Sequence, residues 1–380
     1  MASEIGDTFA YVGSYTVENA VRDRFVTNAK GIEVFRVRGK DGVWEHVQTV
    51  EQLNPMYLLL CWERKVLYAA SSDSNLVYAY RVDGETGALS PLNCQAVDGK
   101  STLCLGLSGD GQYLVVGSIS GHVACVQVEP DGSLGRVCDD FALPGEAGPL
   151  RGAQPWPRAH HSVFDPKGRY CYIVDKGKDT VDTYHIDPKS GKMTCVSSLQ
   201  GRGGSCLRHI VFHPSGRFAY VNAEYIGTVL TCLWTPETGK LETIQILPTI
   251  PEDYVENYSL SSELELHPNG RFLYVSNRGH DSIAIFEVDP DSGRLTTLGW
   301  QKVGNIPRYF AIEPGGRYLY VCNQGTGEIC AFAINPETGM LKPVGEKIQT
   351  PTPVWLEFSG PIHAQLAERE DGESWQSAKG

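Results

Sequence analysis

The chain has 380 residues, of which 41% are apolar and 10% aromatic, so it is long and apolar enough to bury a large core. Its formal net charge of −12 argues against nucleic-acid binding, which requires clustered Lys and Arg side chains. No run approaches the roughly 20 apolar residues of a membrane span, so we expect neither a nucleic-acid nor a membrane partner.

The N-terminal segment MASEIGDTFAYVG has no basic start followed by an apolar run, so the sequence predicts no secretory signal. The 11 cysteines form no Cys-x-x-Cys pair, and several occupy apolar positions of strand-like runs, where free cysteine behaves as a small hydrophobe. An odd count without framework spacing favours a reducing compartment, and we predict a cytoplasmic protein. Nothing in the sequence assigns an oligomeric state.

A unit of about fifty residues recurs along the chain. Its clearest copies are DPKGRYCYIVDKG at 165–177, HPSGRFAYVNAE at 213–224, HPNGRFLYVSNRG at 267–279 and EPGGRYLYVCNQG at 313–325. Each copy combines an apolar segment, a Pro-x-Gly-Arg turn and β-rich runs separated by Gly, Asp or Ser-Gly turns. This pattern predicts four short antiparallel strands in each unit, and no segment shows a sustained helical period.

Counting these units predicts an all-β, seven-bladed β-propeller. Six units are complete, and their second strands begin near Tyr68, Tyr113, Tyr170, Phe218, Phe272 and Tyr318. The N-terminal unit lacks a first strand, and the C-terminal strand at about 353–358 lacks partners, so their pairing would close the ring and remove exposed edges. We expect a single propeller domain over residues 1–365 and a polar, mobile tail over 366–380.

Two insertions lengthen the repeat, LPGEAGPLRGAQPWPRAHH at 143–161 and ILPTIPEDYVENYSL at 246–260. Both precede first strands, which line the central channel of a propeller. We therefore expect both insertions to overhang the channel mouth, where loops on a rigid scaffold commonly carry function.

Polar residues that differ from copy to copy mark a candidate site, because a position that serves only the fold tends to be uniform. The copies carry such residues after their second strands and at the start of their first strands. The first set is Asp175, Glu224, Arg278 and Gln324, and the second set is His160, Arg208, Glu263 and Arg308. If the ring closes, both sets point toward the channel mouth and share one polar cavity.

A cavity of this composition suits hydrolysis of a small anionic lactone. His160 or Glu224 is the candidate base that activates a water molecule, since His or a perturbed Glu accepts protons near neutral pH. Arg208 or Arg278 is the candidate donor to the tetrahedral oxyanion, and Arg also binds a phosphate or carboxylate in a bidentate manner. No Gly-x-Ser-x-Gly elbow is present, so no covalent serine nucleophile is predicted.

Further candidate substrate-binding residues accompany these four catalytic candidates. They are Arg308, Glu263, Asn277, Gln324 and His209. Although Glu224, Glu263, Asn222 and Asn277 offer oxygen ligands, the sequence has no Asp-rich loop or His/Cys spacing typical of a metal site. We therefore predict direct recognition of an anion by Arg, without a metal and without a cofactor.

These motifs, together with YVGSYT at 11–16 and IPRYFAIEPGGRYLYVCNQ at 306–324, resemble the propeller lactonase family. That family includes 6-phosphogluconolactonases of the propeller type and carboxy-cis,cis-muconate cyclases. The resemblance implies an active-site set that falls on His160, Arg208, Glu224 and Arg278. The segments NPMYLLLCWERKVLYAASS at 54–72 and VVGSISG at 115–121 depart from the family, so we expect blades two and three to contribute less or to bind a different substituent.

Three functions are compatible with this reading. The first is a lactonase that converts 6-phospho-D-glucono-1,5-lactone to 6-phosphogluconate in the pentose phosphate pathway. The second is a cyclase or lactonase for a carboxylated muconate, in which the same groups handle carboxylates and proton transfer at carbon. The third is a non-catalytic binding scaffold, because a propeller fold alone does not establish catalysis.

Overall fold

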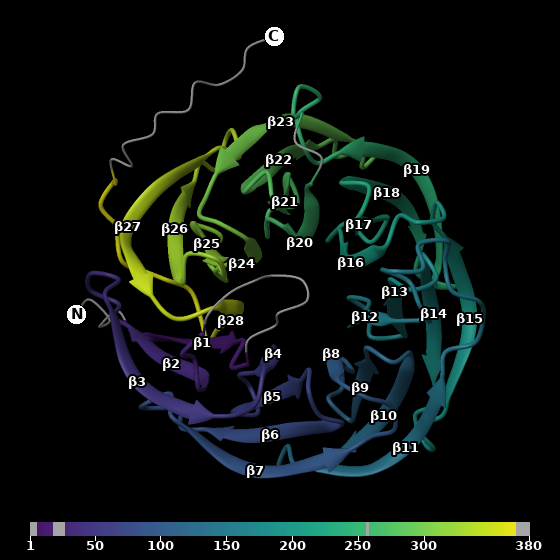
Figure 1. Cartoon of the computed structure of the whole chain (residues 1–380). Helices are drawn as coiled ribbons and strands as arrows, with labels where there is room; N and C mark the ends of the chain where they lie inside the picture. The colour runs from purple at the N-terminus through teal and green to yellow at the C-terminus, as the bar shows by residue number, and fades with distance from the viewer. Residues whose placement is uncertain (1–5, 18–26, 256–257, 370–380) are drawn as a thin grey trace.

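The computed structural model describes residues 6–17, 27–255 and 258–369. Its strands form seven four-stranded antiparallel sheets around one axis, and no helix is present in these described ranges (Figure 1). Hence no described segment is a helix long and apolar enough to cross a membrane. The predicted all-β, seven-bladed propeller is confirmed.

The seven blades follow one another along the chain. Blade 1 contains β28 (Pro353–Phe358), β1 (Thr8–Ser14), β2 (Gly31–Val37) and β3 (Trp44–Glu51). Blade 2 contains β4 (Pro55–Cys61), β5 (Val66–Ser71), β6 (Leu76–Val82) and β7 (Leu89–Ala96). Blade 3 contains β8 (Thr102–Leu107), β9 (Tyr113–Ser118), β10 (His122–Val128) and β11 (Leu134–Ala142).

The remaining blades have the same order. Blade 4 contains β12 (Ala159–Phe164), β13 (Tyr170–Asp175), β14 (Thr180–Ile186) and β15 (Met193–Gln200). Blade 5 contains β16 (Leu207–Phe212), β17 (Phe218–Ala223), β18 (Thr228–Thr235) and β19 (Lys240–Pro248). Blade 6 contains β20 (Leu260–Leu266), β21 (Phe272–Arg278), β22 (Ser282–Val288) and β23 (Leu295–Lys302). Blade 7 contains β24 (Pro307–Ile312), β25 (Tyr318–Asn323), β26 (Glu328–Ile334) and β27 (Leu341–Gln349).

The ring closes where the two ends of the chain meet in blade 1. β28 pairs antiparallel with β1, with Leu356 opposite Val12 and Phe358 opposite Ala10. This pairing confirms the predicted closure and leaves the innermost position of blade 1 to the C-terminal strand. The innermost strands β28, β4, β8, β12, β16, β20 and β24 surround the channel (Figure 1).

Neighbouring blades are joined by a contact that the repeat supplies several times. Buried tyrosine hydroxyls donate to glycine carbonyls in turns of the next blade, for example Tyr220 to Gly293 at 3.0 Å and Tyr274 to Gly339 at 2.8 Å. Gly339 has φ 69°, and a Cβ there would come within 2.4 Å of the Phe272 ring, so the turn requires glycine. The repeated residues therefore build and seal the ring.

The C-terminal segment stays on the propeller further than the sequence predicts. Leu366, which we assigned to the tail, is buried, and its amide donates to the Tyr318 hydroxyl at 3.1 Å. Glu368 forms a β-bridge with Val344. Residues 366–369 therefore pack on the propeller through a buried apolar side chain and a backbone pairing. The rest of the predicted tail, 370–380, lies outside the described residues.

Candidate active site

One end of the channel opens into a cavity of about 740 Å³. Much of its wall comes from two repeat positions, the residue at the end of the second strand in blades 1 to 6 and the residue near the start of the first strand in blades 2 to 5 and 7. The first position contributes Tyr15, Ser72, Ile119, Lys176, Glu224 and Arg278, and the second contributes Met56, Leu103, His160, Arg208 and Arg308. The fold thus brings together five of the predicted site residues from blades 4 to 7.

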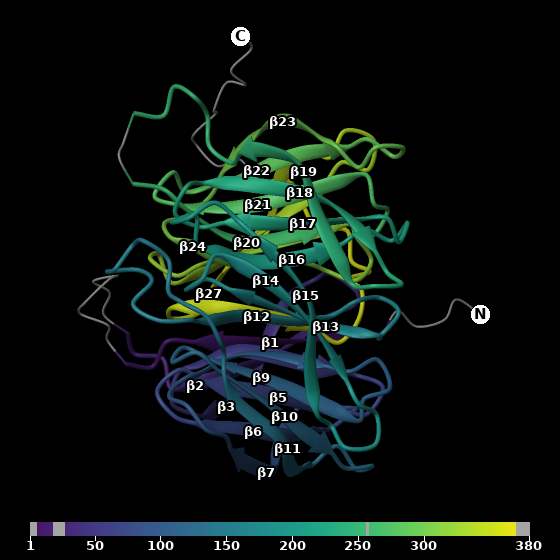
Figure 2. The same ribbon diagram turned by 90° about the vertical axis from the view of Figure 1, so that its right-hand side faces the viewer.

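Both predicted insertions reach this mouth. Arg158 from the first and Tyr258 and Leu260 from the second line the cavity. Residues 249–255, which follow β19, project from one face of the ring (Figure 2). The first insertion also packs on the turn after β13, because Gln154 Nε2 donates to the Lys176 carbonyl at 3.0 Å. The expectation that the insertions overhang the channel is therefore confirmed for their described residues.

Glu224 is the centre of the charged wall. Lys176 Nζ lies 2.5 Å from its Oε2, Arg278 Nη2 lies 3.0 Å from its Oε1, and Arg208 Nε lies 3.4 Å from its Oε2. Burial alone would raise the pKa of Glu224, but these three cations hold that pKa well below its usual range. Glu224 is therefore an ionised carboxylate that draws three cationic side chains to one point.

Lys176 belongs to the same cluster, but its environment favours its neutral form. Burial, with the charges of Arg158 and Arg278 nearby, lowers the pKa of Lys176 to about 7, although Glu224 opposes the shift. Its ammonium group thus lies in a locally positive environment at the cavity wall. A lysine in this setting gains from a second anion, which a ligand in the cavity would supply.

His160 lines the same cavity next to these cations. Burial, and then the positive charge of Arg208, lower the pKa of His160 well below its usual range, so the imidazole is neutral at neutral pH. Its Nδ1 has no hydrogen-bond partner among the described residues. A neutral imidazole at the wall of a polar cavity has the properties required of a proton acceptor.

A second layer lies directly beneath Arg208. His209 and Glu263 are buried, and His209 contacts Arg208 through Nε2 and Glu263 through Nδ1. Strict strand alternation would turn His209 away from Arg208, but the β16–β17 register shifts between Leu207 and Ile210. This bulge keeps both side chains at the channel, in line with the tendency of bulges to re-aim side chains near sites.

Below this layer, aromatic rings from several blades meet, and none of them lines the cavity. Trp355 lies between Tyr57 and Tyr309, with ring centroids 3.8 and 4.1 Å away, and His161 stacks on His209 at 4.6 Å. The lining of the cavity therefore ends above these rings.

Besides His209 and Glu263, which lie beneath the cavity, two predicted site residues lie away from it, Asn277 and Gln324. The Asn277 carboxamide bonds to Thr249, accepting from its hydroxyl at 2.8 Å and donating to its carbonyl at 2.7 Å, so it holds the loop before β20. Gln324 lines a separate hollow with Asn305 and Thr350. Asn277 therefore serves the loop backbone, as polar residues at strand ends often do. The Gln324 carboxamide has no hydrogen-bond partner among the described residues and faces a different hollow from the one that the sequence predicts.

Asp175, included in the first polar set, also serves the backbone. Its Oδ1 accepts from the amides of Arg158, Gly177 and Lys178 at 2.7, 2.8 and 3.0 Å. The cavity residue of blade 4 is the next one, Lys176, which the sequence-based prediction missed. Aligning VDKG with NAEY and SNRG would have found it, because Lys176 then falls opposite Glu224 and Arg278.

The cavity wall carries an excess of positive charge. Arg158, Lys176, Arg208, Arg278 and Arg308 provide five cations, against the two carboxylates Asp73 and Glu224. The whole chain has a formal net charge of −12, so this local excess is opposite to the balance of the protein. Within the described ranges, no group of three or more His, Cys, Asp or Glu residues has the arrangement of a metal site.

The ring of blades coincides with the part of the chain that is similar to known proteins. The family model described as Lactonase, 7-bladed beta-propeller matches residues 9–358. The chain belongs to this lactonase family. A 6-phosphogluconolactonase of Bacillus subtilis (strain 168) is 33% identical over 308 residues, covering 80% of this chain and 84% of its own length. One from Pectobacterium carotovorum is 29% identical and covers 72% of this chain and 79% of its own length.

The lactonase fold is also similar to that of a solved structure. The periplasmic gluconolactonase of Pseudomonas aeruginosa superposes with a TM-score of 0.84 at 29% identity, covering 93% of this chain and 99% of its own. These relatives bear names of lactone hydrolases, so the predicted enzyme class is confirmed at the level of the family. Because one relative is periplasmic, the cytoplasmic location of this lactonase family member stays a prediction.

Proposed function

We propose that this protein hydrolyses 6-phospho-D-glucono-1,5-lactone to 6-phosphogluconate. The observation that carries the proposal is the wall of five cations and two carboxylates in a channel cavity of a lactonase-family chain. Arg and Lys groups recognise a phosphate through charge-assisted hydrogen bonds, and a neutral sugar lactone needs no such excess. The names of the curated relatives support the same substrate.

The proposed base is His160 rather than Glu224. Both carboxylate oxygens of Glu224 are already engaged by cations, whereas His160 lines the cavity with a neutral ring whose Nδ1 has no hydrogen-bond partner among the described residues. His160 would take a proton from water as the water oxygen bonds to the lactone carbonyl carbon. This assignment gives Glu224 the task of gathering Lys176, Arg208 and Arg278 around the substrate.

The cationic side chains stabilise the negative charge that forms on the substrate during the reaction. As the carbonyl π bond breaks, negative charge develops on its oxygen, and a guanidinium from Arg208 or Arg278 stabilises that charge, worth roughly 3–4 kcal/mol for a well-placed donor. Collapse of the intermediate breaks the bond to the ring oxygen, which receives the proton from the His160 imidazolium. The product is an open-chain acid that ionises, and the base is restored.

The test is a comparison of substrates with the purified full chain. We expect kcat/KM for the phosphorylated lactone, measured by coupled oxidation of 6-phosphogluconate, to exceed that for glucono-1,5-lactone at least about tenfold. Spontaneous lactone opening is subtracted with protein-free controls. Equal rates on the two lactones would contradict phosphate recognition, and turnover of carboxy-cis,cis-muconate instead would establish the cyclase alternative.

A further inference from the structure

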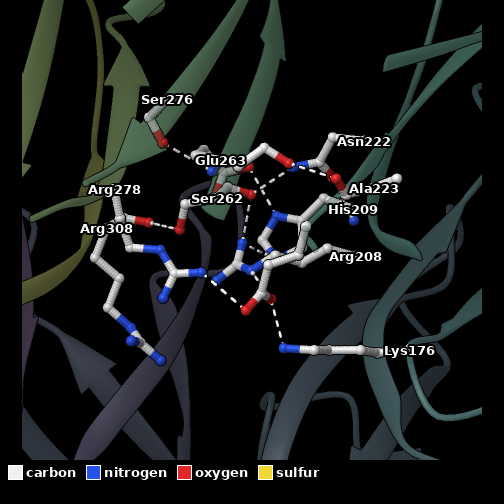
Figure 3. Close-up of polar contacts among 12 residues, drawn as sticks. Lys176, Arg208, His209, Asn222, Ala223, Ser262, Glu263, Ser276, Arg278 and Arg308 are labelled. Carbon is white, nitrogen blue, oxygen red and sulfur yellow. Dashed lines mark hydrogen bonds and ion pairs between the residues drawn. The ribbon is translucent and has the colours of Figure 1, made fainter. Parts of the chain in front are cut away.

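Beneath the cavity, three buried side chains form a row that leads from Glu263 to Arg208 (Figure 3). Glu263 Oε1 lies 2.8 Å from His209 Nδ1, and His209 Nε2 lies 2.9 Å from Arg208 Nη1. The exposed fractions of Glu263, His209 and Arg208 are 5%, 2% and 5%. The row ends at the wall of the cavity, where Arg208 approaches Glu224.

The chemistry of Arg208 determines the direction of the hydrogen bonds in this row. A guanidinium carries only N–H donors, so His209 Nε2 must accept with its lone pair. The ring proton is then on Nδ1, which donates to Glu263 Oε1. Burial and the charge of Arg208 also lower the pKa of His209 well below its usual range, in agreement with a neutral ring.

The fold alone does not require a carboxylate and an imidazole in this layer. At the repeat position of His209 and Glu263, the other blades carry Tyr57, Cys104, His161, Tyr309 and Trp355. A buried carboxylate is costly unless its oxygens are paired, and Glu263 Oε2 has no hydrogen-bond partner among the described residues. Among the seven innermost strands that the structure describes, a hydrogen-bonded Glu–His pair occurs at this repeat position only beside Arg208, which indicates a role connected with that guanidinium.

The charged groups around Arg208 exert opposing electrostatic forces on its guanidinium, so a fixed orientation of that group requires a further contact. Glu224 attracts it from the cavity side, while Arg278 repels it. Its Nη1 also donates to the backbone carbonyl of Ser262 at 2.6 Å. Without the lone pair of His209, the Ser262 carbonyl would be the one remaining acceptor for Nη1 among the described residues, and the guanidinium would be less fixed in its present orientation.

We propose that His209 and Glu263 are positioning residues that fix the orientation of the Arg208 guanidinium toward the reacting carbonyl. His209 acts by direct contact, and Glu263 acts by selecting the tautomer that leaves Nε2 able to accept. The inference rests on the proposed lactone hydrolysis for its kinetic consequence, but the hydrogen-bond direction is a property of the unliganded protein.

The kinetic test is a double-mutant cycle in the full chain. Asn at position 209 places its amide near the Nδ1 position and loses the acceptor for Arg208, whereas Gln places an oxygen near the Nε2 position and keeps it. We expect His209→Asn to lower kcat/KM at least about tenfold, His209→Gln to recover most of that loss, and His209→Asn to change it less than about twofold in an Arg208→Ala background. Additive effects in the two backgrounds would overturn the inference.

Two further measurements separate positioning from folding. His213→Gln changes a buried histidine that bonds to the Gly270 carbonyl in a turn, and kcat/KM per folded protein should stay within about twofold. In the unchanged protein labelled with ¹⁵N-histidine, long-range ¹H–¹⁵N spectra should show His209 neutral with its proton on Nδ1. A proton on Nε2 would overturn the inference even if every variant unfolds. If the protein turned over no lactone, only the proposed function would be contradicted. The spectrum that reports the His209 tautomer would still test the positioning inference.

Discussion

The two sides of the cavity have different chemistry although the same repeat builds them. At the end of their second strands, blades 4, 5 and 6 carry Lys176, Glu224 and Arg278, whereas blades 2 and 3 carry Ser72 and Ile119. At the start of the first strands, the contrast is between His160 and Arg208 on one side and Met56 and Leu103 on the other. The charged side has the groups for recognition of an anion. At these two repeat positions the opposite side carries small or apolar side chains, and the charged residue that it adds to the lining, Asp73, is an anion.

The scaffold under these two sides is nevertheless the same. Tyr68 of blade 2 donates to Gly132 at 2.9 Å, as Tyr220 of blade 5 donates to Gly293 at 3.0 Å. The residues that join blades are therefore repeated on both sides, and the residues that face the cavity vary. The comparison teaches that a few positions per blade carry the chemistry, and that changes confined to them leave the ring intact.

The largest expected effect comes from removing the proposed base on the charged side. We expect His160→Ala to lower kcat on the phosphorylated lactone by about 10²–10⁴-fold, the usual contribution of a general base. KM should change much less, because the cations that bind the anion are untouched. Steady-state kinetics with circular dichroism as a check on folding provides the measurement.

Replacement of a residue on the opposite wall provides the control for that change. Leu103→Met keeps an apolar side chain of similar volume at the equivalent position of blade 3, and kcat should stay within about threefold of the unchanged protein. A loss of kcat in Leu103→Met as large as in His160→Ala would remove the distinction between the two sides. An unaffected His160→Ala would assign the proton transfer to another group.

The sequence predicts the ring well and the site less completely, for a physical reason. Repetition makes strand number, turns and closure readable, because every blade must satisfy the same packing. The site depends on which of two adjacent residues faces the channel, and a shift of one position exchanges Asp175 for Lys176. Bulges at the start of the inner strands also break simple alternation, which is why His209 lies with Arg208 at the channel. Such register shifts leave no clear mark in a single sequence.

An intermediate effect is expected from making blade 4 resemble blade 3. Lys176→Ile places the side chain of Ile119 at the equivalent position, removing one cation 2.5 Å from Glu224. Loss of a charged hydrogen bond of about 1.5–3 kcal/mol predicts a rise in KM for the phosphorylated lactone of about 10–100-fold. KM for glucono-1,5-lactone, which lacks the phosphate, should rise much less.

The matched change on the other side is Ile119→Ala. It alters the same repeat position in blade 3 without altering charge, and KM for the phosphorylated lactone should stay within about threefold. If Ile119→Ala raised KM as much as Lys176→Ile, the substrate would be held by both sides of the cavity, and the assignment of anion binding to blades 4 to 7 would be wrong.

The smallest expected effect is a pH dependence that belongs to the charged side alone. The pKa of Lys176 is lowered to about 7, so its ammonium group is charged below that pH and loses its proton above it. KM for the phosphorylated lactone should therefore rise a few-fold between about pH 6.5 and 8.5. The substrate phosphate, with a second pKa of about 6, gains charge over the same range and would by itself lower KM, so the sign identifies the protein group.

Lys176→Arg provides the decisive comparison for this pH effect. A guanidinium keeps its charge throughout the range, so KM in this variant should not rise with pH. Titration of His160 does not contribute to this change in KM. Its pKa lies well below the usual value, so its ring takes up a proton only at a pH below the range tested. An identical rise of KM in Lys176→Arg would show that the titrating group lies elsewhere, and the two sides of the cavity would then respond to pH alike.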